Sequence, residues 1–128
     1  MTEYIIDAYA WIEYLDGSSK GVKVRNVIES QANNIYTCAV TIAEIVSKFL
    51  RRKFDPEIAF NTIIATSHVI QVDHKLSLIA GKLHAKMRKH VSDFGLADAY
   101  VLACAKTNNA RIVTGDPHFR SVRGVLMI

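Results

Sequence analysis

Four acidic residues stand in apolar stretches of this 128-residue chain, where carboxylates are uncommon. They are Asp7, Glu44, Asp98 and Asp116. Glu44 is the only charged residue among residues 39–46, and Asp98 is the only one among residues 96–105. An unpaired carboxylate in such surroundings costs several kcal/mol unless it takes up a proton, pairs with a base or binds a cation. These acids are therefore the first candidates for chemistry.

The sequence places no base near the four acids on the same expected faces. If the acids converge, they repel one another, and one or two divalent cations would relieve that repulsion. Oxygen ligands without a histidine or cysteine pattern favour Mg²⁺ or Mn²⁺ over Zn²⁺. Such a cation lowers the pKa of a bound water and so supplies a nucleophile at neutral pH. We therefore expect a metal-dependent hydrolytic site.

Each acid also has a simpler structural interpretation that the sequence leaves open. Asp7 could cap a following helix, and Glu44 could pair with a lysine from another helix. Asp98 could be a buried structural acid, and Asp116 could be an ordinary turn residue. Asp93 is either a helix cap or a residue at the rim of the same site. The five histidines show no ligand spacing, so surface or hydrogen-bonded roles are expected for them.

Apolar runs and helical apolar spacing predict the elements that position these acids. Strands are expected over residues 4–6, 35–37, 69–72, 111–114 and 125–127. Helices are expected over residues 9–15, 21–30, 40–52, 56–66 and 96–107, with another that follows a cap at Asp73. Alternating strands and helices predict an α/β fold with a mostly parallel sheet of about five strands and helices on both faces. Ligands bind at the carboxyl ends of such strands, where Asp7 and Asp116 lie.

The composition fits a single domain over residues 1–128. A formal charge of +4 and a pI near 9.2 suggest an anionic partner such as nucleic acid. No apolar run approaches the roughly 18 residues of a membrane helix, and no basic region precedes the apolar start, so no signal peptide is expected. Cys38 and Cys104 stand apart in apolar contexts and are expected to be buried thiols, which suits a reducing cytoplasm.

Lysines on the helix before the last one are candidates for substrate binding. Lys75, Lys82, Lys86 and Lys89 are spaced so that one helical stripe would carry them, apart from the apolar face. Such a stripe can hold a phosphate backbone without reading bases, and Lys82, Lys86 and Lys89 are the candidate contacts. A solvated surface face is an equally good interpretation. The basic residues 51–53 are a second candidate, although cations are favoured at a helix C-terminus anyway.

The order and setting of the acids resemble those of the PIN-domain nucleases, and most closely the VapC-type toxins of prokaryotic toxin–antitoxin pairs. The family's first acid ends the first strand, as Asp7 does, and its second lies on a helix after the second strand, as Glu44 does. Its third opens an alanine-rich helix, which matches Asp98 within residues 96–103. Its fourth belongs to a Thr/Ser-x-Asp-x-x-Phe signature, which residues 114–119 match. The resemblance covers essentially the whole chain.

This resemblance implies a three-layer PIN-like fold and a Mg²⁺- or Mn²⁺-dependent endoribonuclease. Asp7 and Asp98 are implied as the firmest metal ligands, and Asp116 would complete the set directly or through water. Glu44 would bind a second metal or orient the attacking water, and Thr114 would position Asp116 or metal-bound water. The toxin role further implies RNA as the substrate, a homodimer, and inhibition by a cognate antitoxin.

One position departs from the family's pattern, and other functions stay open. The family usually has Ser or Thr two residues after its first acid, where this chain has Tyr9, so we expect a remodelled corner of the site. A PIN-type nuclease in RNA processing, or one acting on DNA, is the main alternative. A non-enzymatic PIN-like binding module is another. A receiver-like signalling domain is disfavoured, because residues 7–9 contain one acid and residues 114–116 contain no lysine.

Overall fold

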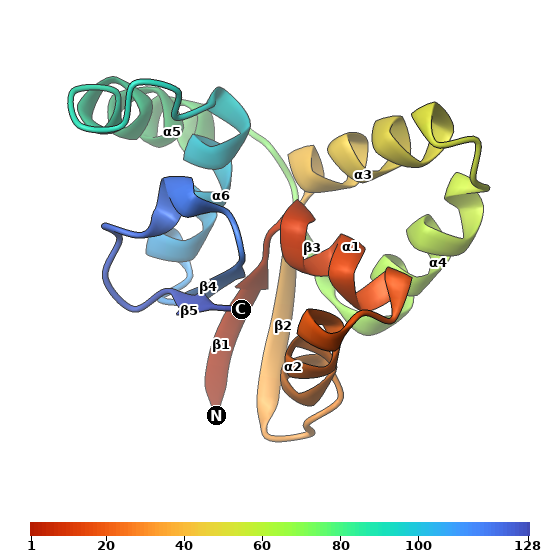
Figure 1. The fold of residues 1–128 in the computed structure, drawn as a ribbon. Helices are drawn as coiled ribbons and strands as arrows, with labels where there is room; N and C mark the ends of the chain where they lie inside the picture. Colours follow the sequence, from red (N-terminus) through yellow and green to blue (C-terminus); the bar gives the residue numbers. More distant parts are fainter.

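A parallel sheet of five strands lies at the centre of the computed structural model, which describes all residues from 1 to 128 (Figure 1). The strands are β1 (Thr2–Ile6), β2 (Asn33–Cys38), β3 (His68–Ile70), β4 (Arg111–Thr114) and β5 (Leu126–Met127). Their order in the sheet is β3-β2-β1-β4-β5, and every neighbouring pair is parallel. The expected parallel α/β sheet of about five strands is therefore confirmed.

Helices cover both faces of the sheet, as the alternation of elements predicted. The helices are α1 (Ala8–Asp16), α2 (Ser19–Ile28), α3 (Ala39–Arg51), α4 (Pro56–Thr66), α5 (His74–Met87) and α6 (Leu96–Thr107). Two separate buried clusters show which helices share a face. Ile5 and Ile112 pack with α5 and α6, whereas the next residues, Ile6 and Val113, pack with α1 to α4. Successive side chains of a strand point to opposite faces, so each central strand contributes to both clusters.

Side-chain caps explain several helix starts. The Asp55 carboxylate accepts a hydrogen bond from the Glu57 amide at 2.9 Å, and Asp73 accepts one from the Leu76 amide at 2.8 Å. The cap at Asp73 was expected from the sequence. The predicted lysine stripe is wrong at its last member, because α5 ends at Met87 and Lys89 lies in the turn beyond it.

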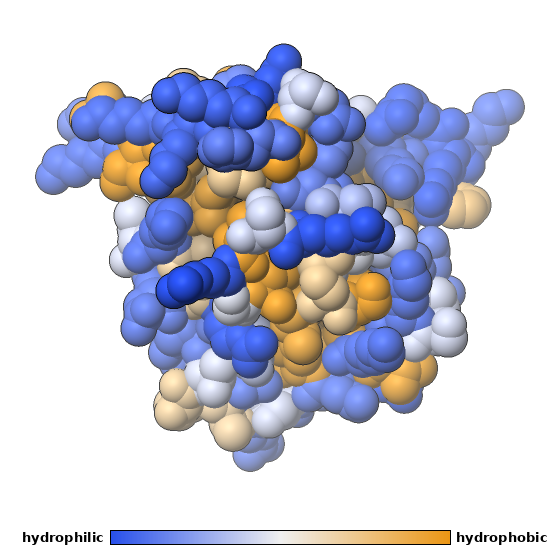
Figure 2. All heavy atoms as spheres, turned by 60° about the vertical axis from the view of Figure 1, so that its left-hand side comes forward, coloured by the Kyte–Doolittle hydropathy of each residue, from blue (hydrophilic) through white to orange (hydrophobic).

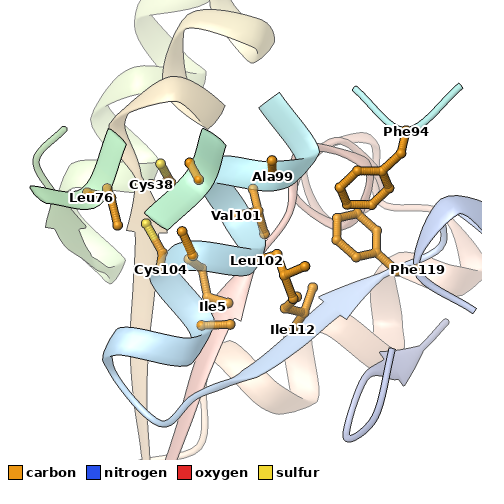
Figure 3. Packing of buried hydrophobic residues seen from close by; sticks show 13 residues of the cluster. Ile5, Cys38, Leu76, Phe94, Ala99, Val101, Leu102, Cys104, Ile112 and Phe119 are labelled. Atoms are coloured by element: carbon orange, nitrogen blue, oxygen red, sulfur yellow. The ribbon is translucent and has the colours of Figure 1, made fainter. Parts of the chain in front are cut away.

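A short 3-10 helix, η1 (Pro117–Phe119), follows β4 and was not expected from the sequence. Phe119 at its end is fully buried, and its ring meets the ring of Phe94 edge-on with centroids 5.6 Å apart. Figure 3 shows this pair at one end of the cluster that α5 and α6 form, with the buried thiols of Cys38 and Cys104 toward the other end. The phenylalanine of the matched signature therefore anchors the segment after β4 to the core.

The strand order creates a switch point at the centre of the sheet. From β1 the chain builds β2 and β3 on one side, and it then crosses over to place β4 and β5 on the other side. Crossovers that leave in opposite directions open a crevice outside the carboxyl ends of the strands at the switch point, where ligands bind in folds of this kind. Here that crevice lies between β1 and β4.

None of the helices is long and apolar enough to cross a membrane.

A close contact between α1 and α2 generates a stability prediction. A Cβ atom at Gly21 would lie 2.1 Å from the Glu13 carbonyl oxygen, whereas one at Gly81 would meet nothing within 4 Å. We expect Gly21→Ala to destabilise the fold by about 1–3 kcal/mol through overpacking. Gly81→Ala, on the exposed side of α5, should stabilise it by about 0.5–1 kcal/mol through helix propensity. Urea denaturation of the two variants measures both effects, and equal midpoints would contradict the described contact.

Candidate metal centre and cleft

The four acids selected from the sequence line one cavity of about 590 Å³. Asp7 follows β1, Asp116 follows β4, Glu44 lies on α3 and Asp98 lies in the first turn of α6. We call this cavity the acidic cleft. The expected convergence is therefore confirmed, and it occurs at the switch point of the sheet.

A second, smaller hollow of about 250 Å³ lies between α6 and β4 and contains no carboxylate. Figure 2 shows the face of the molecule that carries α5, α6, β4 and β5, with apolar atoms exposed at its centre and hydrophilic side chains across it. This hollow contains no carboxylate, histidine or cysteine that could hold a metal ion. The acidic cleft is therefore the candidate functional site.

Asp7 is the most buried of the four acids, with only 4% of its surface exposed. It occupies the residue before α1, but its side chain does not cap that helix. Its Oδ2 instead accepts a hydrogen bond of 2.8 Å from the Thr114 hydroxyl. Burial raises the pKa of Asp7 from 3.8 to about 6; the Thr114 hydrogen bond opposes this rise, and the charges of Asp98 and Asp116 add to it. A capping role for Asp7 is therefore not supported.

Thr114 joins the acids at the ends of β1 and β4. It is fully buried, and its hydroxyl donates to Asp7 while accepting a hydrogen bond of 2.9 Å from the backbone amide of Asp116. The Asp116 Oδ1 accepts a hydrogen bond of 2.9 Å from the His118 amide, which orients the carboxylate at the start of η1. Thr114 therefore couples the positions of both acids, which agrees with the supporting role expected for it.

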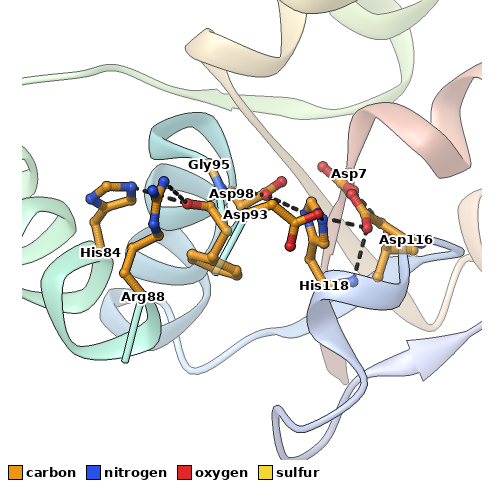
Figure 4. A network of polar contacts seen from close by, with 10 residues as sticks. Asp7, His84, Arg88, Asp93, Gly95, Asp98, Asp116 and His118 are labelled. Carbon is orange, nitrogen blue, oxygen red and sulfur yellow. Dashed lines mark hydrogen bonds and ion pairs between the residues drawn. The ribbon is translucent and has the colours of Figure 1, made fainter. Parts of the chain in front are cut away.

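Asp98 is held by a network that the sequence did not reveal (Figure 4). Its Oδ2 accepts hydrogen bonds from the Gly95 amide and from the His118 Nδ1, both at 3.0 Å. The other ring nitrogen of His118 lies 3.1 Å from Asp93 Oδ2, and Nδ1 also lies 3.5 Å from Asp116 Oδ1. Ionised carboxylates only accept hydrogen bonds, so the two contacts favour the protonated ring, in which both nitrogens donate. The hydrogen bond to Asp98 is the main reason that the pKa of His118 is raised.

Two expectations about bases and rim residues change with this network. The hydrogen-bonded role expected for the histidines is confirmed for His118, which is a base in direct contact with Asp98. The expectation that no base lies near the acids is therefore wrong. Asp93 lies at the rim of the site and contacts His118, whereas Gly95 occupies the residue before α6. The only sequence feature that could have indicated this contact is the position of His118, two residues after Asp116 in the signature.

Glu44 differs from the other acids because it is exposed and has no base within 4.0 Å. The pairing with a lysine that the sequence left open is not present. Its carboxylate borders the cleft, where lost contact with water and repulsion from Asp7 and Asp98 raise its pKa to about 7. Glu44 is therefore an uncompensated negative charge beside the other acids.

The donor groups in the acidic cleft fit a divalent cation. Ligand atoms of Asp98, Asp116 and His118 all lie within 4.8 Å of one another. Burial is the main cause of the raised pKa values of Asp7 and Glu44, and repulsion from the neighbouring acids, which a cation would relieve, adds to it. Carboxylate oxygens are the ligands that suit Mg²⁺ and Mn²⁺.

Cations border the acidic cleft on the side of α3. Lys48 and Arg51 line it together with Tyr9, which stands where the family has a small hydroxyl residue. Lys82 and Lys86 are exposed on α5 and do not line the cleft. The cations that line the cleft therefore lie on α3, whereas the lysine stripe that was the first candidate lies on α5.

The model of the PIN domain family matches residues 4–125. The chain belongs to the PIN domain family. A comparison with curated protein sequences found no match. The receiver-like alternative is therefore wrong, because the family model identifies the chain as a PIN domain and the strand order is consistent with that identification.

Solved structures share the fold over nearly the whole chain. Mycobacterium tuberculosis VapC20, described as a sarcin-ricin loop cleaving toxin, has a TM-score of 0.79 and 15% identity, with 98% of each chain covered. VapBC2 from Rickettsia felis, bound to a promoter DNA fragment, has a TM-score of 0.72 and 16% identity, covering 99% of this chain and 98% of that one. DNA-bound VapBC from Salmonella typhimurium has a TM-score of 0.73 and 15% identity, covering 100% and 98%. At these identities the likeness shows the three-layer PIN fold.

The buried Asp7 carboxylate generates a pH-dependence prediction for this PIN domain. Its pKa of about 6 lies above its ordinary value of 3.8, so the folded state binds this proton more tightly than the unfolded chain does. Stability is therefore fully present below about pH 4 and is lost as the pH rises through 6, by up to roughly 2–3 kcal/mol. In EDTA, Asp7→Asn should be more stable than the wild type at pH 7.5 and about equal to it near pH 4.

Urea denaturation at several pH values between 4 and 8 tests this expectation. Glu57→Gln is the matched control, because Glu57 is an exposed acid in the first turn of α4, outside the cleft. A wild type that gains stability over Asp7→Asn as the pH rises would contradict the described burial of Asp7.

Proposed function

We propose that this PIN domain is a Mg²⁺- or Mn²⁺-dependent endoribonuclease that acts as the toxin of a type II toxin–antitoxin pair. The observation that carries the proposal is the convergence of four carboxylates in one cleft, where repulsion between them contributes to the raised pKa values of Asp7 and Glu44. Membership of the PIN family supports a nuclease that hydrolyses phosphodiester bonds. The basic groups on α3 support an anionic chain as the substrate.

In this proposal Asp7, Asp98 and Asp116 hold the cation, and Glu44 orients the attacking water or helps to hold a second cation. A bound cation lowers the pKa of that water and stabilises the negative charge that develops on the phosphoryl group. Thr114 keeps Asp7 and Asp116 at a constant separation through its two hydrogen bonds. Each acid therefore has a position that its neighbours in the fold determine.

The substrate and partners follow from the relatives that share the fold. VapC20 is described as cleaving the sarcin-ricin loop, which supports RNA as the substrate of this chain. Structures of VapBC and FitAB pairs support a cognate antitoxin as a partner. We further propose a homodimer and a cytoplasmic location. A PIN nuclease that processes RNA or acts on DNA is the alternative, followed by a non-enzymatic PIN module.

The metal-dependent activity gives the first functional prediction. Pure protein should cleave labelled single-stranded RNA with Mg²⁺ or Mn²⁺, and EDTA should abolish cleavage. Asp7→Asn and Asp98→Asn should each lower the rate by at least roughly 100-fold, because the remaining carboxylates hold the cation poorly. Glu57→Gln should cleave as the wild type does, since Glu57 lies outside the cleft.

Each contrary outcome of this assay has a definite meaning. Cleavage that persists in both variants would remove the metal mechanism. Equal cleavage of DNA and RNA would favour the DNA nuclease, and specific binding of RNA without cleavage would favour the non-enzymatic module.

The basic side chains give a second functional prediction. We expect Lys48→Gln combined with Arg51→Gln to weaken RNA binding and to lower the slope of log affinity against log salt by about 1 for each residue. Lys82, Lys86 and Lys89 stay candidates for more distant phosphates, and Lys82→Gln with Lys86→Gln should have the smaller effect. An unchanged slope in the Lys48 and Arg51 double variant would exclude these two residues as phosphate contacts.

A further inference from the structure

Tyr9 occupies the mouth of the acidic cleft. It is the second residue of α1, two positions after Asp7, and its side chain is half-buried. It lines the acidic cleft and also an adjoining hollow of about 130 Å³, which Lys48 and Arg52 border as well. The ring therefore stands where the cleft continues from the acids along the surface between α1 and α3.

Core packing does not explain this ring. The other tyrosines of the chain are Tyr4, Tyr14, Tyr36 and Tyr100. All four pack as partly buried residues against one of the two core clusters, and Tyr9 packs against neither. An aromatic ring outside the core and inside a cleft is a candidate for contact with a ligand.

Gly115 leaves space for the ring of Tyr9. A Cβ atom at Gly115 would lie 2.2 Å from Cε1, 2.7 Å from Cδ1 and 2.8 Å from Cζ of Tyr9. The backbone of Gly115 has no positive φ that would itself require glycine. The close approach of the ring is therefore the structural reason for glycine between Thr114 and Asp116. It places Tyr9 directly against the segment that carries one of the acids.

Lys20 supplies a cation beside the ring. Its Nζ donates a hydrogen bond of 3.0 Å to the Tyr9 hydroxyl and lies 5.3 Å from the ring centroid. Lys20 is exposed, and no carboxylate lies within 4.0 Å of its ammonium group. Its charge is therefore free to meet an anion that approaches the same edge of the cleft.

We propose that Tyr9 stacks on the nucleobase next to the scissile phosphate and that Lys20 binds a phosphate of the same strand. This inference rests on the proposed ribonuclease function and adds how the substrate is selected. An aromatic ring combined with cations along a groove is the arrangement by which proteins hold single-stranded nucleic acid. A base within a duplex cannot stack on Tyr9 without leaving its partner, so the cleft accepts an unpaired nucleotide at this position.

The test compares protein variants with RNAs that lack single bases. The RNA is one that the wild type cleaves, and a set of copies carries an abasic ribose at each position around the cleavage site. Binding is measured by fluorescence anisotropy in the Asp98→Asn background with Mn²⁺, so that the RNA stays intact. The variants are Tyr9→Leu, Tyr9→Phe and Lys20→Gln. The matched controls are Phe60→Leu, an exposed aromatic residue on α4, and Lys23→Gln, an exposed lysine on α2.

Removal of one particular base should weaken binding to the parent protein roughly 5- to 150-fold, the range found for a base stacked on an aromatic residue. Tyr9→Leu should weaken binding of the intact RNA by a similar factor and should no longer respond to loss of that base. This loss of response is the coupling expected between groups in contact. Tyr9→Phe should restore most of the affinity, and Lys20→Gln should lower the salt slope, while both controls should behave as the parent.

Two failures are distinguishable. If the wild type cleaves RNA but Tyr9→Leu and the parent respond equally to every abasic position, the stacking inference is wrong and the proposed function stands. If the wild type neither binds nor cleaves RNA with either cation, the proposed function fails and the inference fails with it. Unchanged RNA binding by Tyr9→Leu, together with weaker inhibition by a protein partner, would assign the ring to that partner and overturn the inference. Thermal unfolding of each variant verifies that its fold is intact.

Discussion

Electrostatic repulsion among carboxylates is the constraint on which the rest of the site depends. Four acids line one cleft, and burial together with the charges of the neighbouring acids raises the pKa values of Asp7 and Glu44. The fold holds the acids there with specific contacts, from Thr114 to Asp7 and from His118 to Asp98. An arrangement that lowers the stability of the metal-free protein is retained when function needs it.

The sheet makes this arrangement possible because β1 and β4 are adjacent and parallel. Their carboxyl ends bring Asp7 and Asp116 to the same edge, and the buried Thr114 links the two across the strands. Phe119 then fastens the following turn to the core, so that the backbone around Asp116 has a defined course. The matched signature thus combines one ligand, one positioning hydroxyl and one anchor within six residues.

Sequence reasoning succeeded where local patterns decide the structure. The helix over 96–107 and the strand over 111–114 have the predicted bounds, and the caps at Asp55 and Asp73 depend only on neighbouring residues. Sequence patterns did not predict the contacts between segments that are far apart in the chain. The contact of His118 with Asp98 joins the turn after β4 to the start of α6, and no local pattern contains it. Glu44 lies in an apolar run, but periodicity alone cannot show that its side of α3 faces an open cleft.

Tyr9 and Gly115 show how one departure from the family's pattern is accommodated by a second residue of the chain. A tyrosine after the first acid needs space that a small residue must leave, and Gly115 leaves it on the strand end that carries Asp116. The hydroxyl expected close to the metal is therefore replaced by an aromatic surface farther out, next to Lys20. Asp7 is held by the Thr114 hydroxyl and not by the residue at position 9. The cation site and the surface that meets the substrate can thus vary independently within one cleft.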